Sequence, residues 1–147
     1  MQNKEFSNIR HYLGKSQKQL AQLLCVSTKA IQSFEQGWRR IPANAERQLL
    51  FLLSLKISLD NKSIPCWEII NCPVEWRENC SAWEFKAGHL CWFVSGTFCQ
   101  GKLKGSWREK IKICRQCIVF KSRLPNIRNF KNQSSDLSST SLILRAK

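Results

Sequence analysis

Apolar residues near the start of the chain recur with the spacing of a short amphipathic helix. Phe6, Ile9 and Leu13 lie at i, i+3 and i+7, a pattern typical of one buried helix face. Gly14 follows, and glycine often ends a helix because it adopts a left-handed backbone at little cost. The pattern therefore predicts a first helix that ends at Gly14.

Two further helices are predicted directly after the first. Ser16 and Gln19 have the spacing of a capping box, so a second helix is expected to begin at Ser16. After a turn that contains Cys25, Ser27 is expected to cap a third helix that ends at Gly37. The residues expected to be buried on these two helices are Leu20, Ala21, Leu24, Ile31 and Phe34.

A longer helix is predicted from about Asn44 to Ile57, after Pro42. Its apolar residues from Leu49 to Leu53 are contiguous, so their side chains cannot all lie on one face. We expect the surplus to contact a second copy of the chain or another domain, with enclosure by the small helical bundle as the alternative.

Four polar residues on the third helix lie away from its apolar face. Thr28, Lys29, Gln32 and Ser33 carry hydrogen-bonding groups whose length suits base edges in a DNA major groove. Two helices joined by a tight turn also occur in small bundles without any DNA-binding role. The polar positions, rather than the helical spacing, therefore indicate nucleic-acid recognition.

The segment SQKQLAQLLCVSTKAIQSFEQGWRRIP resembles the helix-turn-helix of the Cro and phage-repressor group, also called the XRE-like family. The resemblance covers about residues 5–57. It implies a repressor-like α-helical bundle of four to five helices that binds double-stranded DNA as a homodimer. The DNA-binding residues that it implies are Gln17 and Gln36 at phosphates, Thr28, Lys29, Gln32 and Ser33 at bases, and Arg39 and Arg40 beside the DNA backbone.

Cys25 stands at the turn position that glycine usually holds in this family. A non-glycine residue with positive φ is strained, so the turn is expected to differ slightly from the family's geometry. Because Cys25 is remote from the other cysteines, we expect a buried small apolar residue rather than a redox or metal thiol.

The other seven cysteines are concentrated in the second half of the chain. Two of them begin a short internal echo, Cys66-Trp67 and Cys91-Trp92, in which an aliphatic residue follows each tryptophan two places later. The stretches CWEIINCPVEWRENC, CWFVSGTFCQGK and KICRQCIVFK resemble the two-CW domain, a small cysteine module of bacteria that is found alone or joined to signalling and DNA-binding parts. The resemblance indicates the limits of a domain rather than its chemistry.

The cysteines of this half are candidate metal ligands. Cys114 and Cys117 form a CxxC, whose spacing lets two thiolates bind one ion, and a capping box at Ser106 predicts the helix that would carry them. An all-thiolate set favours zinc or an iron-sulfur cluster. Disulfides or buried free thiols are the alternatives to metal ligation by these cysteines. His89 is more typical of an exposed turn residue than of a metal ligand. The candidate ligands are Cys66, Cys72, Cys80, Cys91, Cys99, Cys114 and Cys117.

The predicted second domain is a small cysteine-rich α+β domain. Its strand signal is the segment Leu90–Cys99, rich in β-branched and aromatic residues around Gly96, which predicts a hairpin or paired strands. The expected organisation is a helix-turn-helix DNA-binding domain at 1–57, a linker at 58–65, the cysteine-rich domain at 66–120 and a basic, Ser-rich, disordered tail at 121–147.

The net charge of the chain indicates what kind of partner it binds. The net charge is +14, from 24 Lys and Arg against 10 Asp and Glu. Residues 1–57, 58–120 and 121–147 are each basic, which favours a polyanionic partner such as double-stranded DNA. The amino terminus lacks the apolar core of a secretory signal, and the longest apolar run is too short to span a bilayer. A cytoplasmic location is therefore expected, without membrane association, where thiols stay reduced.

The function expected from these features is sequence-specific DNA binding by a bacterial transcription regulator, with a cysteine-rich domain that binds metal or an iron-sulfur cluster and acts as a sensor. The alternative is a metal-carrying or redox module, or a structural interaction platform, whose helix-turn-helix makes protein contacts. No phosphate-binding loop and no set of nucleophile, base and orienting residue is found, so no catalytic residue, substrate or enzymatic activity is expected.

Overall fold

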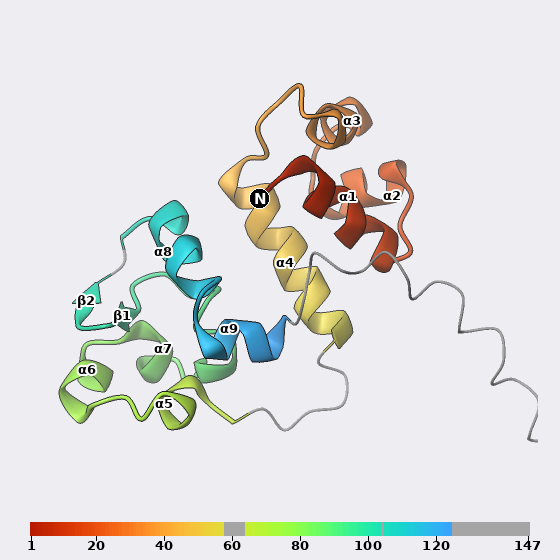
Figure 1. The fold of residues 1–147 in the computed structure, drawn as a ribbon. Helices are drawn as coiled ribbons and strands as arrows, with labels where there is room; N and C mark the ends of the chain where they lie inside the picture. Colours follow the sequence, from red (N-terminus) through yellow and green to blue (C-terminus); the bar gives the residue numbers. More distant parts are fainter. Residues whose placement is uncertain (58–63, 104, 125–147) are drawn as a thin grey trace, which may run out of the picture. The chain divides into compact units, whose positions relative to one another are not determined.

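The structure is a computed structural model that describes residues 1–57, 64–103 and 105–124 (Figure 1). Helices predominate in these residues, together with one two-stranded sheet, in agreement with the expected helical part and small α+β part. The described chain forms two compact units, Met1–Pro42 and a second that begins at Ala43, and each is described by itself. In the described ranges, no helix is long and apolar enough to cross a membrane.

The first unit contains the three helices that the sequence predicts, α1 (Asn3–Tyr12), α2 (Gln17–Leu23) and α3 (Thr28–Gln36). Both halves of the expected capping box are present at the start of α2. The Ser16 hydroxyl accepts a hydrogen bond from the Gln19 N–H at 3.1 Å, and the Gln19 side chain accepts one from the Ser16 N–H at 2.9 Å. Ser27 caps α3 in the same way, through the N–H of Ala30. Local hydrogen bonds therefore determine where these helices begin.

The core of the first unit lies where α1 and α2 contact α3. The rings of Phe6 and Phe34 meet edge to face, with centroids 5.8 Å apart, which joins α1 to α3. Leu13 is only half-buried, unlike the other apolar residues of the predicted face. The predicted core residues that are buried are Phe6, Ile9, Leu20, Ala21, Leu24, Ile31 and Phe34.

The turn between α2 and α3 corrects one expectation. Cys25 has a φ of +52°, so the turn does require a left-handed residue, but its side chain is exposed and the expectation of a buried role is wrong. Leu24 takes the inward position at the end of α2, 2% exposed, and the left-handed residue that follows lies on the outside of the turn.

The second unit combines one long helix with several short elements. Its strands pair antiparallel, with Phe98 opposite Leu103. The elements in chain order are α4 (Ala43–Ile57), α5 (Cys66–Ile69), α6 (Val74–Glu78), α7 (Ser81–Glu84), the 3-10 helix η2 (Gly88–Leu90), β1 (Phe98–Cys99), β2 (Lys102–Leu103), α8 (Trp107–Cys114) and α9 (Ile118–Arg123).

Helix α4 packs on the cysteine-rich elements. The Phe51 ring stacks on Phe93 with centroids 4.8 Å apart, and the Arg47 guanidinium lies over the same ring at 4.4 Å. Contacts with the cysteine-rich elements therefore account for part of the apolar surplus of α4. The sequence prediction assigned this helix to the first domain. The fully buried residues of α4 include Leu49, Leu50 and Leu53.

An aromatic cluster forms the core of the cysteine-rich part. Trp92 is 1% exposed and contacts the rings of Phe93, Trp107 and Phe120, with centroids 5.8 to 6.5 Å apart. The more common role of tryptophan in a small domain, core packing rather than base stacking, therefore holds for Trp92.

Two sequence predictions for this unit are wrong. Of the expected hairpin Leu90–Cys99, only the last two residues form a strand; it pairs with Lys102–Leu103 across the turn at Gln100 (φ +56°) and Gly101 (φ +70°), although Gly96 is left-handed as well (φ +75°). Residues 121–123, which were assigned to the tail, form the end of α9, where Val119 and Phe120 are buried and hold the helix on the core. Residues 58–63 of the linker and 125–147 of the tail lie outside the described residues.

Candidate nucleic-acid interface and cysteine cluster

Helix α3 presents a polar face opposite its buried face. Lys29, Gln32 and Gln36 are exposed at spacing i, i+3 and i+7, so their side chains lie along one side of the helix. Ile31 and Phe34, on the other side, are 0% and 2% exposed. Three of the side chains predicted to contact DNA are therefore accessible on one helix face.

Thr28 and Ser33 complete this face but are less accessible. Both are half-buried, and the Ser33 hydroxyl donates a hydrogen bond to the Lys29 carbonyl at 2.9 Å. The hydroxyl proton of Ser33 is thus used within the helix, while its oxygen can still accept a hydrogen bond from a base. We call Thr28, Lys29, Gln32, Ser33 and Gln36 the α3 polar face.

The loop after α3 continues this surface. Gly37 ends the helix with a φ of +77°, and a Cβ there would lie 3.1 Å from the Asn3 side chain, so both its backbone and its surroundings favour glycine. Arg39 and Arg40 are exposed, as a role beside a DNA backbone requires. Trp38 is 78% exposed, which the sequence reasoning missed. A large aromatic residue directly after a helix-ending glycine, in a polar loop, was the available signal.

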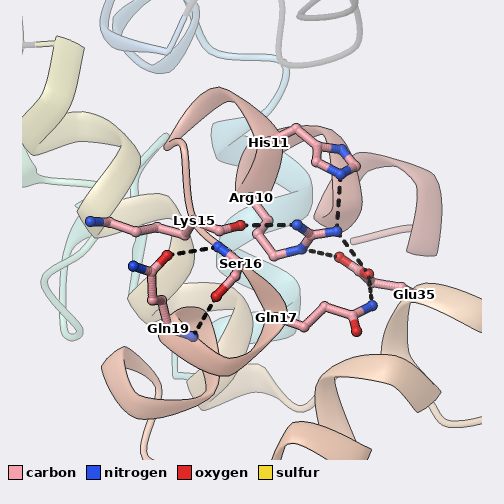
Figure 2. A network of polar contacts seen from close by, with 7 residues as sticks. All are labelled: Arg10, His11, Lys15, Ser16, Gln17, Gln19 and Glu35. Atoms are coloured by element: carbon pink, nitrogen blue, oxygen red, sulfur yellow. Dashed lines mark hydrogen bonds and ion pairs between the residues drawn. The ribbon is translucent and has the colours of Figure 1, made fainter.

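A buried ion pair connects α1 to the end of α3 (Figure 2). The Arg10 guanidinium donates to both carboxylate oxygens of Glu35, at 2.6 and 3.1 Å, and to the Lys15 carbonyl at 2.9 Å. The side chains of Arg10 and Glu35 are 10% and 7% exposed. His11 adds a contact from its ring nitrogen to the same guanidinium at 3.0 Å. The pair is therefore bidentate and largely removed from water.

Glu35 also holds Gln17, at the beginning of α2. The Gln17 amide donates to the second carboxylate oxygen of Glu35 at 2.7 Å. Burial alone would raise the pKa of Glu35, but the hydrogen bonds from Arg10 and Gln17 outweigh it and hold that pKa below its ordinary value. Gln17, predicted to contact a phosphate, is half-buried and fixed to α3 through its amide nitrogen.

The exposed charge of the first unit is entirely basic. Met1–Pro42 contains two acidic residues. Glu5 is buried, and Glu35 is the partner of Arg10. Apart from Arg10, which is buried in this pair, the other charged residues of Met1–Pro42 are exposed cations. They are Lys4, Lys15, Lys18, Lys29, Arg39 and Arg40. Such a surface attracts a polyanion and lacks the carboxylates that would repel one.

The structure brings together the two cysteines that begin the CW echo. Hydrogen bonding with Cys91 lowers the pKa of Cys66, although burial opposes the shift. The same hydrogen bond, together with burial, raises the pKa of Cys91. Cys66 is further stabilised as a thiolate by the Trp67 N–H and by the charge of Arg123. The pKa of Cys66 is therefore lower than that of Cys91.

Burial also shifts the pKa of three other thiols of this half. Burial raises the pKa of Cys72 and Cys99, and it raises the pKa of Cys114 to about 11. The Cys80 sulfur accepts a hydrogen bond from the Phe98 N–H at 3.5 Å. Cys117, the second thiol of the CxxC, lies directly before α9 as the N-cap residue.

Lys110 is a buried cation beside these thiols. It is 2% exposed, and its ammonium donates to the Val94 carbonyl and to the Thr97 hydroxyl. Burial lowers the pKa of Lys110, and the nearby cysteines, led by Cys114, oppose the shift. Sequence reasoning missed Lys110, although its position four residues before Cys114 places both on the buried face of α8.

The cysteines as placed do not fit a metal ion. In the described residues, which include all seven cysteines of this half, no group of three or more His, Cys, Asp or Glu side chains is arranged to hold one. His89 is exposed in η2, as expected for a turn residue. Zinc or an iron-sulfur cluster needs several thiolates at one point, an arrangement that the described residues do not show. The metal assignment stays a prediction.

No protein-family model matches the chain, and no curated protein or solved structure matches it either. The functional conclusion therefore depends on the side chains described above.

Proposed function

We propose that this chain is a sequence-specific DNA-binding transcription regulator in which α3 enters a major groove. The observation that carries the proposal is the α3 polar face, continued by Arg39 and Arg40, on a unit whose exposed charges are all basic. Lys29 and Gln32 have the donors and acceptors that distinguish base edges, while exposed arginines suit phosphates.

The packing of the first unit supports rigid presentation of this face. Ile31 and Phe34 fix one side of α3 in the core, and Glu35 ties its end to Arg10 and Gln17. A recognition helix must hold its side chains in one register to discriminate bases. The buried ion pair and the capping hydrogen bonds supply that constraint without using any residue of the α3 polar face.

The repressor-like fold and the homodimer belong to the same proposal. A short first helix, followed by two helices joined through the turn Leu24–Ser27, fits a helix-turn-helix whose second helix is α3. Two copies would then place two α3 helices on half-sites about one DNA turn apart, roughly 34 Å. We propose the cysteine-rich unit as the sensing part of the regulator, with its thiols as the responsive groups.

Salt-dependent binding of the full chain to duplex DNA tests the proposal. Each phosphate contact contributes about −0.9 to the slope of log affinity against log salt. Phosphate contacts by three of the six exposed cations of one first unit would weaken binding roughly fortyfold between about 50 and 200 mM salt. Fluorescence anisotropy with a labelled duplex measures both the affinity and the slope.

Matched charge removals identify the surface responsible. Arg39→Gln with Arg40→Gln should reduce the magnitude of the slope by up to about 2 for each bound copy, whereas removal of the exposed Lys102 and Lys112 from the second unit should change it little. Binding that is indifferent to salt would contradict the proposal and favour the alternative, in which the first unit contacts protein. An equal effect of both double variants would mean that the basic surface of the first unit is not the interface.

A further inference from the structure

Trp38 lies in the loop after α3 and leaves most of its ring open to solvent. It is 78% exposed, whereas Trp92, in the aromatic core of the second unit, is 1% exposed. A buried aromatic side chain removes about 150 to 250 Å² of surface from water, and at Trp38 most of this area stays uncovered. Single exposed apolar residues are common on protein surfaces, so the surroundings of Trp38 decide what its ring contacts.

The backbone on both sides of Trp38 is held by the first unit. Gly37 ends α3 in the left-handed conformation, with a φ of +77°, and the Arg39 N–H donates a hydrogen bond to the Ser33 carbonyl at 3.2 Å. Ile41, three residues after Trp38, is 8% exposed and fixes the other end of the loop in the core. The loop therefore presents the Trp38 ring from an anchored backbone.

The charges around Trp38 favour a polyanion. Two exposed arginines follow it directly, and the exposed charges of Met1–Pro42 are all basic. The exposed aromatic residues of the second unit have different neighbours, because Trp83 and Phe85 flank the exposed carboxylate of Glu84. Trp38 thus combines an accessible ring with adjacent cations and without an exposed carboxylate beside it in the sequence.

An exposed ring beside cations is the arrangement with which proteins bind unpaired bases. Every base has a flat π face on which an aromatic ring stacks, while the neighbouring cations contact the phosphates. In fully paired DNA the base faces are covered by the adjacent base pairs, so a ring on the protein surface reaches only sugars or groove edges. An unpaired base offers its whole face without the cost of unstacking a pair.

We propose that Trp38 stacks on an unpaired base of the bound DNA, with Arg39 and Arg40 on the adjacent phosphates. The site deepens the proposed DNA-binding function and rests on it for the identity of the polymer. It uses no residue of the α3 polar face, and it recognises a structural feature of DNA rather than a base edge. The chain then binds most tightly where a base has left the stack beside the duplex that α3 contacts.

The test compares two dye-labelled duplexes of one sequence, of which one is fully paired and the other carries one additional, unpaired 2-aminopurine at its centre. Fluorescence anisotropy gives the affinity of the full chain for each duplex, and quenching of the 2-aminopurine emission reports stacking. We expect the wild type to prefer the bulged duplex roughly tenfold and to quench the emission. Trp38→Ala should abolish both effects, and Trp38→Phe, which keeps a ring, should retain part of each.

Matched variants separate stacking from charge. Phe85→Ala removes an exposed aromatic residue from the second unit and should leave both the preference and the quenching unchanged. Arg39→Gln with Arg40→Gln should weaken binding to both duplexes and reduce the salt dependence. A preference that disappears equally in Phe85→Ala and Trp38→Ala would overturn the proposal.

The outcomes also distinguish this site from the regulator proposal. Equal affinity of the wild type for the two duplexes, with salt-dependent binding to both, would overturn the stacking site and leave the regulator proposal standing. A preference for the bulged duplex that survives Trp38→Ala would overturn the role of Trp38 in the same way. Failure to bind either duplex would overturn both proposals.

Discussion

Removal of the Arg10 guanidinium should destabilise the first unit strongly. Arg10→Met keeps much of the aliphatic side chain but leaves the Glu35 carboxylate buried, with the Gln17 amide as its remaining neighbour in this network. Because the two side chains are only 10% and 7% exposed, solvent cannot replace the lost partner. Deletion of one member of a buried ion pair costs about 3 to 5 kcal/mol, and the retained Gln17 hydrogen bond favours the lower end.

A loss of about 3 kcal/mol corresponds to a roughly hundredfold larger opening equilibrium, since each 1.4 kcal/mol is a factor of ten. Hydrogen exchange of the full chain, followed by mass spectrometry, reports that opening for peptides from α1 to α3. The control is Arg39→Met, which removes an exposed arginine from the same unit and should change protection by less than about threefold.

A double variant distinguishes the buried charge from lost packing. Arg10→Met with Glu35→Gln removes both charges, so we expect it to recover part of the protection lost in Arg10→Met. Two results would refute the role assigned to the ion pair. One is a loss of hydrogen-exchange protection of less than about fivefold in Arg10→Met; the other is a double variant that is less stable than the single one by the full cost of a second deletion.

Three other predictions concern different parts of the chain. Folding lowers the pKa of Glu35, so the stability that Glu35 contributes is present above the ordinary pKa of 4.5 and is lost as pH falls through the lower folded pKa. In chemical denaturation, the stability difference between the wild type and Glu35→Gln should shrink in that pH window. A constant difference would contradict the assignment. Trp38→Ala should weaken binding to duplex DNA about tenfold without a change in helix content by circular dichroism, and unchanged affinity would exclude Trp38 from the interface. Gly88→Ala should destabilise the second unit by about 1 to 3 kcal/mol in denaturant titrations, because its Cβ would meet the Trp67 ring at 2.6 Å, and full stability would show that the packing is looser.

The helices of the first unit could be predicted because their signals are local. The capping box at Ser16, the cap at Ser27 and the left-handed stop at Gly37 each involve residues within a few positions of one another. The side-chain direction of Cys25 could not be predicted in this way, because the same turn leaves room for either an inward or an outward residue.

The second unit was harder to predict because its contacts are non-local. The CxxC spacing of Cys114 and Cys117 is a local signal, whereas the packing of η2 against α5 at Gly88 joins residues that are far apart in the sequence. The burial of Lys110 could not be predicted from the number of charged residues either. A lysine is ordinarily exposed, and only the backbone and hydroxyl acceptors at Val94 and Thr97 make this position tolerable.

Selection of binding sites from random duplex DNA tests the central claim most directly. The full chain should enrich one sequence motif, and Lys29→Ala with Gln32→Ala should enrich a motif that is relaxed or changed at the positions facing these side chains. Lys4→Ala, which removes an exposed cation from α1, should enrich the wild-type motif with reduced affinity at most. Enrichment of an identical motif by the α3 double variant would contradict the account, because base recognition would then lie elsewhere on the molecule.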